Sequence, residues 1–261
     1  MLPGFLEVLP IPGVYLVVVL LILFACEVGF RIGRRYHLQR RDEGAPGSLA
    51  PVVSGLLGML AFLLAFTFSM ASTQHGGRNQ NVRDEAAAIS SAYHRAALMP
   101  DAVGDDIRRL LREYVDIRLR AAETLDWKSA DVRSREIHVE LWRVVSASAK
   151  AQPDTNSALV AESVNAVMTM HETRILAAVH ARIHGAVWVG LLLIASLTMG
   201  TLGIQIGLNG KRRLIAVTPI ALAFAVLVTL IIDLNRPQGG FITVGQRALQ
   251  DLQVEMVRAA K

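Results

Sequence analysis

The sequence has few charged residues, and those few are unevenly placed. Asp, Glu, Lys and Arg make up 19% of its 261 residues, below the roughly 25% that is usual for soluble domains. Four stretches contain none of them, namely residues 8–26, 52–77, 185–210 and 214–232. An apolar run of about 20 residues is long enough to cross the hydrocarbon core of a bilayer as a helix. We therefore predict four membrane spans, at about 11–30, 52–73, 186–207 and 214–234.

Other absences narrow the range of functions. The single cysteine, Cys26, lies in the first predicted span, so an intrachain disulfide is excluded. The sequence has no G-x-S-x-G, no phosphate-binding loop and no H-E-x-x-H motif. We expect no enzyme activity, no cofactor and no metal site. His180 and His184 are four residues apart and supply only half of a zinc site, so we interpret them as interfacial polar residues.

The basic residues predict the orientation of the spans. No Lys or Arg precedes the first span, whereas a secretory signal peptide begins with positive charge. Basic residues instead gather in the short loops 31–51 and 208–213, and short basic loops are usually cytoplasmic. We expect the N-terminus, residues 74–185 and the tail 235–261 on the opposite side of the membrane. Because these loops account for the net charge of +5, we expect no nucleic-acid partner.

The long segment between the second and third spans has the pattern of a helical domain outside the membrane. Apolar residues recur at helical spacing, and the breaks fall at MPDAVGDD and AQPDTNS. The expected helices cover about 78–99, 103–128, 131–150 and 155–185, with Asp131 as the start of the third. Together with the spans, this segment predicts an all-α integral membrane protein.

Two of these helices are expected to be continuous with membrane spans. Gly76-Gly77 is the weak point after the second span, and two glycines kink a helix more readily than they end it. The pattern therefore favours one continuous helix there over an interfacial loop. Helix 155–185 is likewise expected to enter the third span, since Gly185 is its only breaker. The tail begins with the β-like run FITV, and Leu249, Leu252 and Met256 then form a helical stripe, which indicates either a docking helix or a frayed end.

The second span carries small, aromatic and hydroxyl residues on one face. Spacings of three and four residues align Gly55, Gly58, Phe62, Phe66, Ser69 and Thr73. Such a face is typical of a pore lining with a hydrophobic constriction. It is equally typical of close packing between helices of one subunit, because small residues let backbones approach. The candidates for a pore lining are Gly58, Phe62, Phe66, Ser69 and Thr73. In the third span, Gly200 and Gly203 predict a packing seam.

Three ionisable residues near membrane depth are candidates for function. Glu27 precedes Arg31 by four residues, a favourable spacing for an ion pair that fixes the depth of the helix. Asp233 ends the fourth span, where an acid opposes the helix dipole and needs a cap or a partner. Arg236 is the nearest partner in the sequence. We interpret DLNRPQGG as a rigid helix exit that seats the tail, and a role at an ion entrance is the alternative.

Three stretches carry a resemblance to a known family. FTFSMASTQHGGRNQNVRDEAAAI, LLREYVDIRL and DLNRPQGGFITV make the chain, over about residues 10–255, similar to the bacterial bestrophin-like membrane protein family. The family name implies an analogy to bestrophins, which are pentameric anion channels with four spans per subunit. The resemblance implies a location in a bacterial plasma membrane. Bestrophins keep their helical domain in the cytoplasm, whereas the basic loops here predict a periplasmic N-terminus, helical domain and tail.

These observations leave two classes of function. The first is a channel in the lipid bilayer, which needs a homo-oligomer because four spans rarely enclose a pore alone. Arg78 and Arg83 follow the uncharged face of the second span and would favour anions. The second is a membrane scaffold or sensor with a helical head and no transport activity. A pore predicts that the aromatic face lies on a common axis, whereas a scaffold predicts its burial within one subunit.

Overall fold

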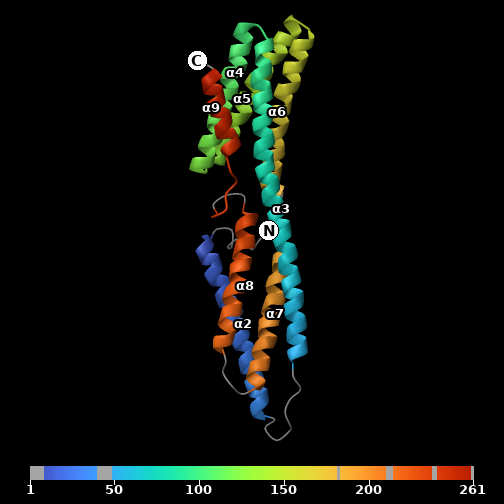
Figure 1. The fold of residues 1–261 in the computed structure, drawn as a ribbon, viewed down its shortest axis with the longest axis vertical. Helices are drawn as coiled ribbons and strands as arrows, with labels where there is room; N and C mark the ends of the chain where they lie inside the picture. Colours follow the sequence, from blue (N-terminus) through green and yellow to red (C-terminus); the bar gives the residue numbers. More distant parts are fainter. Residues whose placement is uncertain (1–8, 40–48, 181–182, 210–213, 237–239, 260–261) are drawn as a thin grey trace. The chain divides into compact units, whose positions relative to one another are not determined.

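The structure, a computed structural model, describes residues 9–39, 49–180, 183–209, 214–236 and 240–259. Within these ranges it is all-helical and has no strand (Figure 1). The elements in chain order are α2 (Ile11–Gln39), α3 (Ala50–Arg95), the 3-10 helix η1 (Ala96–Leu98), α4 (Asp101–Thr124), α5 (Trp127–Ala151), α6 (Thr155–His180), α7 (Gly185–Leu208), α8 (Leu214–Asn235) and α9 (Arg247–Ala259). The all-α prediction is confirmed.

Four of the helices are long and apolar enough to cross a membrane. They are Ile11–Gln39, Ala50–Leu98, Gly185–Leu208 and Val217–Asn235. Each contains most of one predicted span, so the four-span prediction is confirmed by length and composition. The first two extend well beyond the 20 or so residues that a bilayer requires.

Helix α3 has no break at Gly76-Gly77, as the sequence favoured. The expectation that helix 155–185 continues without a break into the third span is wrong. Helix α6 ends at His180, and His184 has an extended backbone with φ −60° and ψ 141° before α7 begins. The backbone N–H of Ile183 donates to Oδ1 of Asn235 at 2.9 Å. This side-chain bond replaces the helical hydrogen bond that continuity would require.

The chain divides into two compact units, which we describe separately. The span unit comprises Met1–His75 and Arg182–Thr243, and the helical unit comprises Gly76–Ala181 and Val244–Lys261. In the span unit, α2 packs against α7 and α8. In the helical unit, α4 lies beside α5 and α9, and α5 also contacts α6 (Figure 1).

A seam of glycines joins α2 and α7 in the span unit. A Cβ atom added at Gly29 or Gly33 would overlap the α7 backbone, and one added at Gly203 or Gly207 would overlap the α2 backbone. Close backbone approach is the usual way in which helices associate in lipid, where burial of apolar surface gives little driving force between them. The predicted seam on the third span is thus confirmed at Gly203, and its partners on α2 are new.

The helical unit has an apolar core to which the tail contributes. Leu249, Leu252 and Met256 of α9 are buried in it with residues of α4, α5 and α6. The docking interpretation of the tail is therefore correct, while the FITV run before α9 is neither helix nor strand.

The turn between α4 and α5 differs from the prediction. Leu125 ends α4 in the left-handed region at φ 59°, and the Asp126 side chain accepts a hydrogen bond from the N–H of Ser129 at 3.3 Å. Such a side chain satisfies a free donor of the first helical turn. Helix α5 therefore begins at Trp127 and not at Asp131.

Candidate functional site

The predicted pore face of α3 is exposed along its whole length. Gly58, Phe62, Phe66, Ser69 and Thr73 are all exposed to the surroundings of the chain. The exposed fraction is 69% for Phe62 and 57% for Phe66. A Cβ atom added at Gly55 or Gly58 would meet nothing within 4 Å. Packing of this face inside one subunit, the alternative for these residues, is therefore not what the structure shows.

The opposite side of the same helix holds α3 in the span unit. Leu60, Leu64, Thr67 and Ala71 are buried there. In the most apolar window of α3 only 22% of the residues are buried, compared with 56% in α8. Helix α3 thus packs through one narrow side and presents the aromatic and hydroxyl face outward.

The polar groups near membrane depth are individually satisfied. Arg31 Nε donates to Glu27 Oε1 at 2.9 Å, so the ion pair expected from the spacing forms. The buried carboxylate of Asp233 accepts hydrogen bonds from the backbone N–H groups of Phe241 and Ile242, both at 3.0 Å. Nη2 of Arg236 donates to the carbonyl of Leu9 at 2.7 Å. The cap that Asp233 needs therefore comes from the backbone of the tail.

Gly240 shows why the DLNRPQGG segment requires glycine. A Cβ atom at Gly240 would overlap Oδ1 of Asp233, so only glycine lets the chain turn back onto this carboxylate. Residues 237–239 of this segment lie outside the described residues, so its interpretation as a rigid helix exit stays a prediction. A role of Asp233 at an ion entrance stays a prediction.

The two arginines that follow the pore face along α3 differ in accessibility. Arg78 is buried, with 6% of its surface exposed, whereas Arg83 is exposed and donates to Gln80 Oε1. Of the two, Arg83 is therefore the one whose side chain is in contact with solvent.

The helical unit contains a buried network of charged groups that sequence reasoning did not find. Glu85 of α3 is 0% exposed and lies between two guanidinium groups. Its Oε2 is 3.1 Å from Arg174 Nε, and its Oε1 is 3.4 Å from Arg118 Nε. The Tyr114 hydroxyl donates to Oε1 at 2.5 Å. A buried carboxylate with these partners stays in place because each neighbour stabilises its charge.

The network continues from Tyr114 to two more helices. The Tyr114 hydroxyl is 3.0 Å from Nδ1 of His171, and Nε2 of His171 donates to Asp131 Oδ1 at 3.1 Å. Asp131 in turn accepts from Arg135 Nε at 3.1 Å. The chain of contacts runs from α3 through α4 and α6 to α5, and so joins four helices of the unit.

Burial sets the ionisation of the aromatic members. Burial is the main cause that lowers the pKa of His138 to about 4, and the nearby His171 is the second. The centroids of the two rings are 4.8 Å apart. Burial and then Arg174 also lower the pKa of His171. Burial and then Glu85 raise the pKa of Tyr114 well above its ordinary value. Near neutral pH both histidines and the tyrosine are therefore uncharged, and the network is held by carboxylates and arginines.

The sequence did contain a signal for part of this network. Glu85 lies in RDEAAAI, and Tyr114 and Arg118 lie in LLREYVDIRL, two of the stretches that carry the family resemblance. His171 lies outside these stretches. In the part of the chain that the structure describes, no group of three His, Cys, Asp or Glu side chains is arranged to hold a metal ion. His184 is exposed, and the side chain of His180 is outside the described set.

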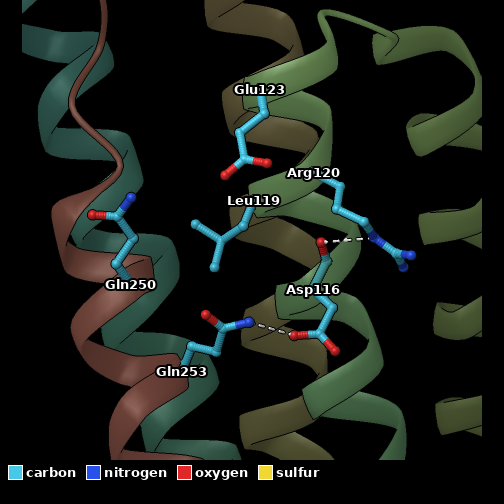
Figure 2. A pocket seen from close by; sticks show the side chains of 6 residues that line it. All are labelled: Asp116, Leu119, Arg120, Glu123, Gln250 and Gln253. Atoms are coloured by element: carbon cyan, nitrogen blue, oxygen red, sulfur yellow. Dashed lines mark hydrogen bonds between the residues drawn. The ribbon is translucent and has the colours of Figure 1, made fainter.

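A polar cleft of about 400 Å³ lies at the surface between α4 and α9. Its lining residues are Asp116, Leu119, Arg120 and Glu123 of α4 and Gln250 and Gln253 of α9. Figure 2 shows Leu119 and Glu123 extending toward α9, whereas the Arg120 side chain points away from it. Gln253 Nε2 donates to Asp116 Oδ1 at 2.7 Å across one end of it. The cleft is open to solvent, and the Gln253–Asp116 hydrogen bond connects the tail helix to α4.

Comparison with known proteins identifies the family. Neither the curated proteins nor the solved structures give a match to this chain. The Bestrophin-like domain family matches residues 19–249. The matched region extends from within α2 to the start of α9 and includes every residue of the buried network. The chain is thus a multi-pass membrane protein that belongs to the Bestrophin-like domain family.

Proposed function

We propose that the protein is a homo-oligomeric ion channel in which the face of α3 from Gly58 to Thr73 lines the pore. The observation that carries this proposal is the exposure of that face in the single chain. In the described part of the chain the other three spans leave this face uncovered, so lipid or further copies around a common axis must cover it.

The chemistry of the face supports an axis over lipid. Ser69 and Thr73 place two exposed hydroxyl groups one turn apart, and Gly55 and Gly58 leave open backbone near the other end. Lipid gives such polar groups no hydrogen-bond partners, whereas water in a pore does. Between these ends, Phe62 and Phe66 would form rings of aromatic side chains in an oligomer. Hydrophobic constrictions of this kind gate channels by excluding water.

Anions are the proposed conducted class. The face of α3 itself has no charge, and the exposed Arg83 follows it along the helix. Basic residues near a pore raise the local concentration of anions. The analogy to the bestrophin anion channels that the family name implies points the same way.

The test is ion flux from liposomes that contain the purified protein. We expect chloride flux above that of empty liposomes, and we expect Phe62→Ala and Phe66→Ala to change its rate or its selectivity over potassium. Phe24→Ala is the matched control, because Phe24 is 68% exposed on α2 and is not part of the α3 face.

The outcomes separate the two classes of function. Flux that responds to Phe62→Ala and Phe66→Ala but not to Phe24→Ala supports the pore. Absence of flux from protein with intact helical content contradicts it and favours a membrane scaffold or sensor. Flux that is equally sensitive to Phe24→Ala contradicts the assignment of α3 as the pore helix.

A further inference from the structure

A basic stripe runs along α2 next to the glycines that contact α7, and it is not part of the proposed pore face. Its residues follow one another at spacings of three and one, which align them on one side of a helix. These residues line a hollow of about 240 Å³. They are Glu27, Phe30, Arg31, Arg34, Arg35 and Leu38. We call this hollow the arginine hollow.

Its depth places it beside lipid headgroups. At 1.5 Å per residue, the roughly 30 Å hydrocarbon core takes up about 20 residues of a helix. Counted from Ile11, the start of α2, those residues end near Phe30. Arg31, Arg34 and Arg35 therefore lie in the next layer, where phosphate groups are found.

The hollow has an excess of positive charge. Glu27 pairs with Arg31 at 2.9 Å and so neutralises one of the three guanidinium groups. Arg34 and Arg35 are exposed, and within the described part of the chain neither forms an ion pair with a carboxylate. Adjacent guanidinium groups are well suited to phosphate oxygens, because each donates two parallel hydrogen bonds.

Two apolar residues also line the hollow. Phe30, which is 4% exposed, lies one turn beyond Glu27, and the exposed Leu38 ends the lining away from the membrane core. A ligand that fits must combine a phosphate with an apolar part directed toward the bilayer. We propose that the arginine hollow binds the headgroup phosphate of an anionic phospholipid. This assignment is independent of whether the protein conducts ions.

The test is native mass spectrometry of the full-length protein in detergent. Equal amounts of phosphatidylglycerol and phosphatidylcholine with the same acyl chains are added, and the bound lipid is counted. We expect preferential retention of phosphatidylglycerol. A surface arginine contributes about fivefold to the binding of anionic lipid, so Arg35→Gln should lower this retention about fivefold and Arg34→Gln/Arg35→Gln about 25-fold.

A matched control removes the same charge elsewhere. Arg247→Gln/Arg258→Gln changes two exposed arginines of α9 and should leave retention of phosphatidylglycerol unchanged. Circular dichroism checks that all variants keep their helical content. Equal retention of both lipids by the unmodified protein overturns the proposal, and so does equal loss in the control variant.

Inorganic phosphate distinguishes a lipid from a free anion. Added at the same concentration as the lipid, it should not displace phosphatidylglycerol, because it lacks the acyl chains that would extend along α2 toward the membrane core. Displacement by inorganic phosphate at equal concentration would overturn the assignment to lipid and leave a site for a free anion.

Discussion

Each of the two units of this protein is stabilised internally by a different kind of contact. In the span unit, α2 and α7 meet through glycines whose backbones touch. In the helical unit, a shared apolar core surrounds a carboxylate that is paired with two arginines. The span unit thus depends on the absence of side chains at its main seam, and the helical unit depends on particular side chains at its centre.

The difference follows from the surroundings expected for each unit. Lipid tails are as apolar as a leucine side chain, so close packing has to replace the hydrophobic effect as the force that joins spans. In water, burial of apolar surface supplies that force, and a buried charge that is paired with opposite charges is tolerated within it. Substitutions that remove a charge should therefore disturb the helical unit, and substitutions that add an atom should disturb the span unit.

The largest effect is expected from Glu85→Gln. This change leaves Arg118 and Arg174 buried without their shared carboxylate, and breaking a buried ion pair from one side costs about 3–5 kcal/mol. Hydrogen exchange in α4, α5 and α6 should report the loss of protection. Glu162→Gln on the exposed side of α6 is the control, with an expected effect within about 0.5 kcal/mol. Equal protection in both variants would show that the network does not stabilise the unit.

Acid should weaken the same unit through His138. Its pKa is about 4 in the folded protein, against about 6.5 in an unfolded chain. Because the folded pKa is the lower one, the unfolded state binds more protons between these values, and stability falls as pH decreases from about 6.5 to about 4. The shift corresponds to about 3 kcal/mol.

The measurement is the free energy of unfolding of the helical unit across this pH range. His138→Leu should flatten the dependence, because leucine has no proton to gain. A dependence as steep in His138→Leu as in the unmodified protein would assign the acid sensitivity to other groups, of which His171 is the nearest.

In the span unit the sensitive change is the addition of one methyl group. Gly203→Ala places a Cβ against the carbonyl of Cys26, and overpacking of this kind costs about 1–3 kcal/mol. Gly190→Ala on the same helix is the matched control, since its Cβ would meet nothing within 4 Å. The melting temperature in detergent should fall for Gly203→Ala only. Equal melting temperatures would mean that α2 and α7 do not approach as closely as described.

The smallest effect is expected where the tail joins the helical unit. The Tyr93 hydroxyl donates to the carbonyl of Met256 at 3.3 Å. Loss of one such hydrogen bond in Tyr93→Phe should cost about 1 kcal/mol. Hydrogen exchange should increase in α9 and stay unchanged in α5. An increase of the same size throughout the unit would show that α9 does not dock as a separate element.

Much of the fold could be predicted because the signals are local. Charge-free runs identify spans, and helical spacing with Pro, Asp and Gly breaks identifies the remaining helices. The error between α6 and α7 had a distant cause, because the bond that holds Ile183 comes from Asn235. No pattern near residue 183 could reveal it. The start of α5 was misplaced because Asp126 and Asp131 are equally good caps by residue type, and only the left-handed Leu125 decides between them.

The candidate sites were predictable to different degrees. The pore face of α3 is a periodic pattern within one helix, and the structure places its members together on an exposed side. Whether they line a pore stays a prediction, as does the side of the membrane on which the helical unit lies. The network around Glu85 could not be predicted, because its members come from four helices. In addition, the sequence does not distinguish a buried, paired carboxylate from one on the surface.

Access of a charged reagent to Ser69 tests the proposed pore most directly. In a Cys26→Ala background, Ser69→Cys places the only thiol on the α3 face, and Phe24→Cys places it on exposed α2 as a control. We predict that a charged, membrane-impermeant thiol reagent stops chloride flux through the Ser69→Cys protein and leaves flux through the Phe24→Cys protein unchanged. Unaltered flux through Ser69→Cys protein that mass spectrometry shows to be fully modified would contradict the assignment of α3 as the pore helix.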